Sequence, residues 1–384
     1  MKIGFFTDTY FPSGFGVSTS IKSFKDNLEK MGHKVYIYAP FFPDYKDKDL
    51  NVFRFNSIKL IKNPETRLSV PFIPIHYLKQ INDIKLDIIH IHTPFSMGFL
   101  GKLVSSYQKI PLIYTHHTHY PDYAKFYLKE KKILPKITEK ITLKYSDYSN
   151  IVIAPSSKTK KYLINLGVKT NIKILPTGVN LNIFKKSSKI FNNFRKELNI
   201  PLDTKIMLFV GRIGKEKNIE FLLKSFQKVL EKNKKPILFL IVGDGPDLIK
   251  LKELSKKLKI NKSIIFIGQV LYKNISKYYQ ISDFFIFSST TETQGIVILE
   301  ALASGLPVIA FNCDAYSQFI HSEKNGFLIN TLSEEMFAKK ILLLLNNNLL
   351  IKEFSKKAIK ISLKFSEEKQ SIKLLDIYKN VIKK

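Results

Sequence analysis

The sequence predicts an α/β protein made of two doubly wound parallel sheets. Short runs of β-branched or aromatic residues alternate with amphipathic stretches along most of the chain, which is typical of strand and helix units in parallel sheets. This pattern starts again near residue 206, so it indicates two domains of similar design. A length of 384 residues and an apolar fraction of 45% are sufficient for each domain to have its own core.

The first domain is expected over residues 1–178, with a Rossmann-like fold. Its expected strands are residues 2–7, 34–39, 52–55, 87–92, 111–116, 151–154 and 172–175. Amphipathic helices are expected over residues 17–30 and 156–166, because Gly32 and Gly167 follow them as helix ends.

The second domain is expected over residues 179–365, again Rossmann-like. Its expected strands are residues 206–210, 237–242, 264–267, 284–287 and 308–311. Residues 177–200 are polar and irregular, so we expect a connection there with the hinge near its start. Residues 366–384 have the pattern of a charged amphipathic helix that can pack on either domain, the first included.

The composition excludes several classes of protein. One cysteine, Cys313, rules out a disulfide framework and the usual cysteine metal sites, which fits a reducing cytosol. The N-terminus offers only the four residues from Ile3 to Phe6 as an apolar run, which is too short for a signal peptide. No uncharged apolar run reaches the ~18 residues of a membrane span. We therefore expect a cytoplasmic protein whose contact with a membrane is peripheral.

The net charge of +30 is the strongest feature of the composition, and both halves of the chain are basic. One interpretation is a lysine-rich composition that only solvates the surface. The other two are an anionic membrane surface and a nucleic acid as partner, because charge bears on partners rather than on fold.

Ligands of open parallel sheets bind beyond the carboxyl ends of the strands, so motifs that follow strands carry the functional argument. Gly14 and Gly16 follow the first strand just before a helix, where backbone N–H groups are able to approach a phosphate. The spacing is not the G-x-G-x-x-G of dinucleotide sites, which argues against a nicotinamide cofactor.

Five of the eight histidines fall at the ends of two predicted strands, at positions 90, 92, 116, 117 and 119. A histidine pair on one strand face is often part of the core. A histidine at a strand end is also suited to bind or orient a reacting hydroxyl. No Asp or Glu stands at a matching spacing, so we predict no metal site.

The second domain has two loops that suit a diphosphate ligand. Arg212 and Lys217 lie in one short loop after a strand, where the two cations are able to share a diphosphate, although solvated charge is the plainer interpretation. Gly243 and Gly245 form a turn after the next strand and would admit the close approach of a ligand. Asp244 has no D-x-D partner that would indicate a divalent metal.

The segment TETQGIVILEALASG has two glutamates eight residues apart, Glu292 and Glu300, around an expected helix over residues 296–304. Eight helical residues span ~12 Å. Glycosidase carboxylates stand ~5 Å or ~6.5–9.5 Å apart, so this spacing argues against a catalytic pair of that kind. We expect two contacts to different parts of one elongated ligand.

The order and spacing of these motifs resemble the family-4 retaining glycosyltransferases of the GT-B fold, in which two Rossmann-like domains face each other. The matching segments are FPSGFGVST, HIHTPFSMG, THHTHY, PTGVN, GRIGKEKN, VGDGP and TETQGIVILEALASGLPV. The finer pattern of TETQG and of residues 117–123 resembles bacterial glycosyltransferases that make monoglucosyl or monogalactosyl diacylglycerol. Pro94 stands where many relatives have an acidic residue, which is a departure from the family pattern.

The resemblance implies roles for individual residues, with a UDP-hexose as co-substrate and neither cofactor nor metal. Glu300 would bind the ribose hydroxyls, and Glu292, with the backbone amides around Gln294 and Gly295, would hold the hexose.

The resemblance also implies which residues meet the diphosphate and the sugar. Arg212 and Lys217 would neutralise the diphosphate, and the amide of Gly16 would approach the β-phosphate. His117 matches the active-site histidine near the sugar, and His116, one residue away, remains an alternative.

Residues 125–144 have the composition of a membrane-binding segment. Seven lysines stand there against two glutamates, interleaved with apolar residues. The lysines expected at an anionic membrane are Lys125, Lys129, Lys131, Lys132, Lys136 and Lys140. Basic amphipathic segments lie in the interface of anionic membranes, although a lysine-decorated surface helix, broken by Pro135, has the same pattern.

We therefore expect a retaining glycosyltransferase that moves glucose or galactose from a UDP-sugar to 1,2-diacylglycerol, on the inner face of the cell membrane. Three alternatives remain open: the same enzyme with a soluble, polysaccharide or other lipid acceptor, a UDP-sugar epimerase, and a basic nucleic-acid binder. The last is favoured by charge alone, because no recognised nucleic-acid module is present.

Overall fold

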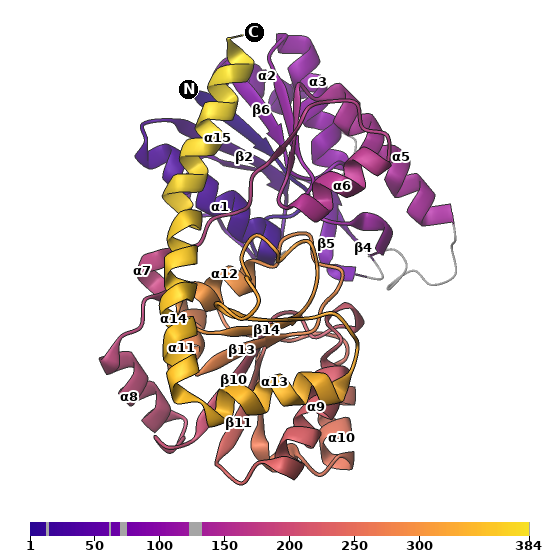
Figure 1. Cartoon of the computed structure of the whole chain (residues 1–384). Coiled ribbons are helices and arrows are strands. Elements are labelled where there is room, and N and C mark those ends of the chain that lie inside the picture. Colours follow the sequence, from indigo (N-terminus) through magenta and orange to yellow (C-terminus); the bar gives the residue numbers. More distant parts are fainter. Residues whose placement is uncertain (13–14, 61–62, 70–74, 123–132, 384) are drawn as a thin grey trace. The chain divides into compact units, whose positions relative to one another are not determined.

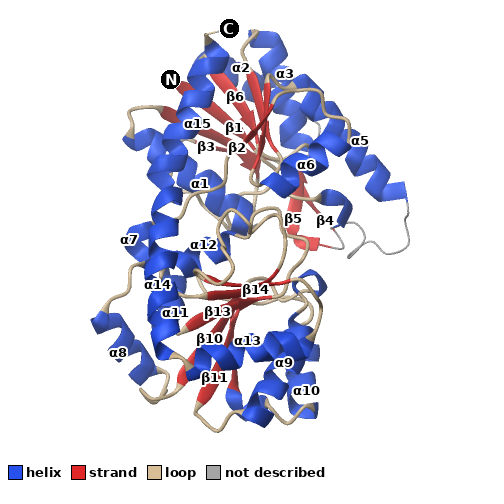
Figure 2. Cartoon of the chain, viewed as in Figure 1, coloured by secondary structure: helices blue, strands red, loops and turns tan. Residues whose placement is uncertain are grey.

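The chain, described by a computed structural model over residues 1–12, 15–60, 63–69, 75–122 and 133–383, divides into two compact units. One unit consists of residues 1–178 together with 367–384, and the other of residues 179–366. Each unit is a parallel sheet with helices packed on it (Figures 1 and 2). The predicted α/β class is thereby confirmed.

The first unit contains a seven-stranded parallel sheet in the order β3-β2-β1-β6-β7-β8-β9. The strands are β1 (Lys2–Phe6), β2 (Lys34–Pro40), β3 (Val52–Phe55), β6 (Ile88–Ile91), β7 (Leu112–Thr115), β8 (Ile151–Ala154) and β9 (Ile172–Ile174). Each of them overlaps an expected strand. The order reverses between β1 and β6, which is where ligands of doubly wound sheets bind.

Helices cover both faces of this sheet, as its all-parallel pairing requires. They are α1 (Phe15–Lys30), α2 (Ile75–Ile84), α3 (Ser96–Gln108), α5 (Ile133–Tyr148), α6 (Ser157–Asn165) and α15 (Glu367–Ile382). Ile3 and Phe5 of β1 join the core that includes α1 and α15, while Phe6 joins the core that includes α3. The C-terminal helix α15 therefore belongs to the first unit and lies beside α1 (Figure 1).

The second unit contains a six-stranded parallel sheet in the order β12-β11-β10-β13-β14-β15. The strands are β10 (Lys205–Val210), β11 (Ile237–Val242), β12 (Ile264–Gly268), β13 (Phe284–Phe287), β14 (Val308–Phe311) and β15 (Gly326–Ile329). The sequence predicted the first five and not the edge strand β15. The principal helices are α9 (Ile219–Lys232), α10 (Leu248–Lys257), α11 (Tyr272–Ile281), α12 (Ile296–Ala303), α13 (Glu334–Asn346) and α14 (Asn348–Ser362).

The expectation of an irregular connection over residues 177–200 is wrong. The segment contains α7 (Leu181–Phe184) and α8 (Ser188–Glu197). Each helix has a side-chain N-cap, since the side chain of Asn180 accepts hydrogen bonds in the first turn of α7, and that of Ser187 accepts one from Ile190 N. Ile190, Phe191 and Phe194 recur at helical spacing in α8, so this helix is defined by an amphipathic face as well as by its cap and the burial of Arg195.

Two short strands that the sequence did not predict, β4 (Ser57–Leu60) and β5 (Asn63–Ser69), form an antiparallel hairpin in the first unit. Pro135 lies in the first turn of α5, where its missing N–H costs nothing, and residues 123–132 before the helix lie outside the described residues. Among the helices that the structure describes, none has the length and apolar character of a membrane span.

Candidate functional site

The predicted donor residues of the second unit gather at the carboxyl edge of its sheet. The Nζ of Lys217, after β10, forms an ion pair with the carboxylate of Glu292, after β13. The Lys217 side chain is only 18% exposed and that of Glu292 16%, so solvent screens the pair weakly. The structure thus brings together two of the charged residues that the sequence singled out.

The end of β13 fixes the loop that carries Lys217. The hydroxyl of Ser288 donates to the backbone carbonyls of Lys217 at 2.6 Å and Asn218 at 3.0 Å. The Nζ of Lys217 also lies 5.6 Å from the ring centroid of Phe287, in the range of a cation–π contact. The side chain of Arg212, in the same loop, contacts Glu216 at 3.5 Å.

Gly243 is accounted for by the packing of two loops. Its φ is +141°, and a Cβ there would lie 1.9 Å from the carbonyl oxygen of Gly211. Its N–H donates to the carbonyl of Gly268 at 2.9 Å. The glycine is therefore required by the neighbouring backbone, and its expected role toward a ligand stays a prediction.

Gly295 and Glu300 belong to the helix α12. Gly295 precedes the helix with a φ of +73°, a left-handed conformation that favours glycine. Glu300, one turn into the helix, is 2% exposed and accepts a hydrogen bond from the hydroxyl of Tyr279 at 2.7 Å. Gln294 is buried just before the turn.

Tyr279, on α11, is a site residue that the sequence did not indicate. Burial, and then the carboxylate of Glu300, raises the pKa of Tyr279 well above its ordinary value, so the hydroxyl keeps its proton and donates to Glu300. A buried carboxylate costs much unless it is hydrogen-bonded, and Tyr279 supplies such a bond.

In the first unit the histidines form two separate groups. The Nδ1 of His92 lies 2.9 Å from the Nε2 of His117, and the ring centroids of His90 and His92 are 4.1 Å apart. His90 is bonded on both nitrogens, to the hydroxyl of Tyr378 on α15 at 2.7 Å and to that of Thr115 at 2.6 Å. The expectation that the pair at 90 and 92 lies on one face is confirmed.

His116 points to the other side of the sheet. Its Nδ1 lies 2.9 Å from the hydroxyl of Tyr114, and its side chain is fully buried, whereas His117 is only partly buried. Burial lowers the pKa of His116 to about 3 and that of His117 to about 4. Burial also lowers the pKa of His92 well below its ordinary value. His92 and His117 are therefore both neutral at pH 7, and one of the two imidazoles donates its N–H to the other.

Asp8, at the end of β1, is a second residue that the sequence did not indicate. Its buried carboxylate accepts hydrogen bonds from the hydroxyls of Thr93 and Ser96 and from the N–H of Met97. A carboxylate at the N-terminus of α3 is favourable to the helix dipole, although burial raises the pKa of Asp8. The motif HIHTPFSMG thus serves in part to bind Asp8.

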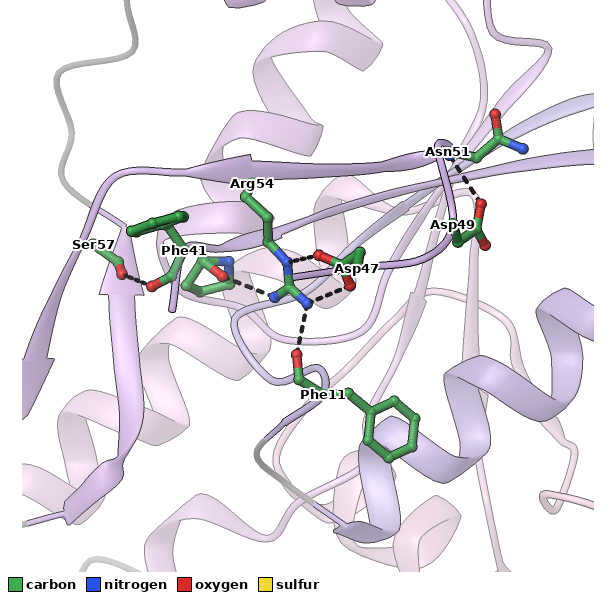
Figure 3. Close-up of polar contacts among 8 residues, drawn as sticks. Phe11, Phe41, Asp47, Asp49, Asn51, Arg54 and Ser57 are labelled. Atoms are coloured by element: carbon green, nitrogen blue, oxygen red, sulfur yellow. Dashed lines mark hydrogen bonds and ion pairs between the residues drawn. The ribbon is translucent and has the colours of Figure 1, made fainter. Parts of the chain in front are cut away.

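Arg54 holds the loop that leads to Gly16 (Figure 3). Its guanidinium makes a bidentate ion pair with Asp47, at 2.7 and 2.8 Å, and donates to the carbonyls of Phe11 at 2.6 Å and Pro40 at 2.8 Å. Gly16 lies in the first turn of α1, and among the described residues no atom stands within 4 Å of the position of a Cβ. Its expected role toward a phosphate stays a prediction, and Gly14 lies outside the described residues.

Of the lysines expected at a membrane, Lys136 and Lys140 lie exposed on α5. Lys125, Lys129, Lys131 and Lys132 lie outside the described residues. Within the described part of the chain, no group of three or more His, Cys, Asp or Glu side chains is placed to hold a metal ion.

Two family models match the chain, one for most of each structural unit. Residues 16–183 match the family described as Glycosyltransferase Family 4, and residues 190–361 match the family described as Glycosyl transferases group 1. Two relatives bear the name alpha-monoglucosyldiacylglycerol synthase. The one from Streptococcus pneumoniae is 37% identical over 351 residues, which cover 88% of this chain and 74% of that protein. The one from Acholeplasma laidlawii is 35% identical, covering 87% and 86%.

Solved structures of the same fold include HepE from Anabaena in complex with UDP and glucose, with a TM-score of 0.80, 18% sequence identity, and coverage of 99% of this chain and 100% of that one. Sucrose-phosphate synthase from Thermosynechococcus elongatus gives a TM-score of 0.78 at 18% identity, covering 99% and 98%. These likenesses confirm the expected GT-B fold.

Proposed function

Since the chain belongs to the glycosyltransferase family of the α-monoglucosyldiacylglycerol synthases, we propose that it moves a hexose from a UDP-sugar to 1,2-diacylglycerol with retention of the anomeric configuration. The observation that carries the donor half of this proposal is the ion pair of Lys217 and Glu292 at the carboxyl edge of the second sheet. The names of the relatives support the acceptor half.

The ion pair suits a donor site in which the bound nucleotide-sugar replaces the contact between Lys217 and Glu292. An arriving diphosphate takes over the ammonium of Lys217, with Arg212 as the second cation. The carboxylate of Glu292 is then released to accept hydrogen bonds from the hexose hydroxyls. The backbone amides around Gln294 and Gly295, next to the N-terminus of α12, complete the contacts to the hexose and the diphosphate.

Glu300 binds the ribose in this proposal. The hydroxyl of Tyr279 bonds one carboxylate oxygen, Oε2, and so fixes the orientation of the carboxylate. A carboxylate fixed in this way suits a diol such as the ribose 2′- and 3′-hydroxyls, because both hydroxyls are donors.

Gly16 and His117 are the proposed contributions of the first unit. The N–H groups in the first turn of a helix have no acceptor within the helix, and the amide of Gly16, in the first turn of α1, donates to the β-phosphate. The neutral imidazole of His117, oriented by His92, binds a hydroxyl near the reacting carbon.

The chemistry requires no carboxylate nucleophile. The bond from the anomeric carbon to the β-phosphate oxygen breaks as the bond to the acceptor oxygen forms on the same face. The proton of the acceptor hydroxyl passes to the leaving phosphate oxygen. The residues position the two substrates and stabilise the charge that develops on the diphosphate, and no cofactor or metal takes part.

A protein with a lipid acceptor has to work at a membrane surface. We place it on the cytoplasmic face, bound through basic residues of which Lys136 and Lys140 are exposed on α5. Attraction to anionic lipids then concentrates the enzyme where diacylglycerol lies.

The test is an assay with labelled UDP-glucose and UDP-galactose in parallel, on vesicles of diacylglycerol with and without anionic lipid. We expect label in monohexosyldiacylglycerol from one or both donors, at a higher rate on anionic vesicles. Transfer to a soluble sugar with no lipid product would favour the rival acceptor, and interconversion of the two donors without acceptor would favour an epimerase.

A further inference from the structure

An unusual apolar stripe runs along the outer face of α3. Phe99, Leu103 and Tyr107 are 54%, 40% and 75% exposed, and they stand four residues apart, so they lie on one side of the helix. The inner face of the same helix is buried in the core of the first unit. A surface helix normally exposes polar residues to solvent. The exposed face of α3 instead has three apolar or aromatic side chains.

A stripe of lysines runs along the neighbouring helix α5. Lys136, Lys140 and Lys144 are exposed and stand four residues apart. The two helices meet at Tyr148, whose ring centroid lies 4.8 Å from the Nζ of Lys102 on α3 and 5.8 Å from that of Lys144. The apolar stripe and the lysine stripe are therefore parts of one surface.

We propose that this surface docks onto an anionic lipid bilayer. The α3–α5 surface consists of Phe99, Lys102, Leu103, Tyr107, Lys136, Lys140, Lys144 and Tyr148. The proposal deepens the proposed function and rests on it, because a lipid acceptor is the reason for a bilayer as partner.

The chemistry of the surface matches such a bilayer. Apolar side chains enter the boundary between head groups and acyl chains, tyrosines are favoured there, and lysines reach the anionic head groups. α3 has no acidic residue, whereas α5 has Glu139 and Asp147 against its lysines, so the surface as a whole is basic. A nucleic acid would use the lysines but leave the apolar stripe in water.

A chain of side-chain contacts links α3 to His116. The carboxylate of Asp8 ties the first turn of α3 to the end of β1. Phe95, just before α3, packs edge-on against Tyr120 with ring centroids 5.0 Å apart, and Tyr120 packs on His116 at 5.9 Å. Docking through α3 would therefore hold the histidine-bearing edge of the sheet near the lipid.

The experiment measures sedimentation of the full chain with vesicles of phosphatidylcholine alone or mixed with phosphatidylglycerol. The test variant has Phe99→Ser, Leu103→Ser and Tyr107→Ser. The matched control has Leu202→Ser, Ile249→Ser and Leu349→Ser, three exposed apolar residues of the second unit. We expect the test variant to lose at least tenfold in its partition onto anionic vesicles, and the control to bind like the native chain.

A second readout separates the docking surface from the proposed function. Transfer to a dispersed short-chain diacylglycerol, without vesicles, should be within twofold of native for both variants, which also shows that they fold. Native-like vesicle binding by a test variant that is active on the short-chain lipid would overturn the docking surface alone. Absence of transfer by the native chain to either lipid would overturn the proposed function. The sedimentation result would still show whether the α3–α5 surface binds anionic vesicles.

Two further results are decisive. If the triple variant does not fold, Lys102→Glu with Lys140→Glu replaces it, with the same tenfold loss expected on anionic vesicles. If the native chain binds a labelled oligonucleotide but not anionic vesicles, the bilayer is the wrong partner and the proposal fails.

Discussion

The ammonium of Lys217 and the carboxylate of Glu292 form an ion pair across 75 residues of sequence, at the edge of the second sheet where its strands end. Both side chains are mostly buried. In the proposed function Lys217 binds the diphosphate and Glu292 the hexose, so binding of the donor separates the pair.

Removal of the Lys217 ammonium should impair catalysis more than it impairs folding. We expect Lys217→Ala to lower kcat/KM by about 10²- to 10³-fold, because one preorganised partner of the developing charge is lost. Lys215→Ala is the matched control, since Lys215 lies in the same 3₁₀ turn and is exposed. Steady-state kinetics of both variants that leave the Lys217 variant fully active would refute the diphosphate role.

Removal of the Tyr279 hydroxyl should weaken recognition of the ribose. Tyr279→Phe leaves Glu300 without that bond, a loss typically of about 1.5–3 kcal/mol for a bond to a charged group. We expect KM for the UDP-hexose to rise about tenfold with little change in kcat. The preference for the natural donor over its 2′-deoxy analogue should shrink.

Tyr278→Phe is the control for this substitution, because Tyr278 lies on the same helix and packs against Phe194 instead. Equal effects of the two substitutions would show that Tyr279 acts only through packing.

The buried neutral histidines should make stability depend on pH. The pKa of His117 is lowered to about 4 and that of His116 to about 3, while the unfolded chain has values near 6.5. Below about pH 6.5 the unfolded state binds protons that the folded state does not, so the free energy of unfolding falls as the pH is lowered toward 4.

The size of this effect is about 1.4 kcal/mol per pH unit for each histidine within that window. Denaturant unfolding at pH 7 and pH 5 measures it. His117→Gln should show a shallower dependence than the native chain, and a free energy of unfolding that is constant between the two pH values would contradict the neutral state.

Arg54 should act on the donor through the loop before Gly16. Arg54→Lys keeps the charge but loses the planar fork that binds Asp47 and the carbonyl of Phe11. We expect a rise of several-fold in KM for the UDP-hexose and a lower melting temperature. Asp47→Asn should change KM and the melting temperature in the same directions. The double variant should show smaller changes than the sum of the two single variants, because Arg54 and Asp47 share one interaction. If the losses of the two single variants add up in the double variant, Arg54 and Asp47 do not act through a shared interaction.

The sheets were predictable because their strands are buried apolar runs. β3, β8, β11, β13 and β14 have the bounds that the sequence predicts. β8, β11, β13 and β14 are buried on both faces and so form continuous apolar runs, whereas the edge strand β3 is only partly buried and was found from its valine and phenylalanines. The edge strand β15 begins at a glycine and β5 of the hairpin is polar, so neither has the continuous apolar run of the central strands, and α8 begins at a cap from Ser187 within a polar segment.

The position of Lys217 and Glu292 at one edge of the sheet was predictable, since both residues follow strands of a parallel sheet. Asp8, Arg54 and Tyr279 were not predictable, because their roles arise from partners that are distant in sequence. Asp8 bonds Thr93 across 85 residues, and Arg54 bonds Phe11 across 43. No periodicity or local spacing carries that information.

A crystal structure of the chain with bound UDP-hexose tests the donor assignment most directly. The account predicts that the Nζ of Lys217 leaves Glu292 for the diphosphate, that Glu292 contacts the hexose, and that Glu300, still bonded to Tyr279, binds the ribose hydroxyls. An intact pair of Lys217 and Glu292 with the diphosphate bound elsewhere, or a ribose away from Glu300, would contradict it.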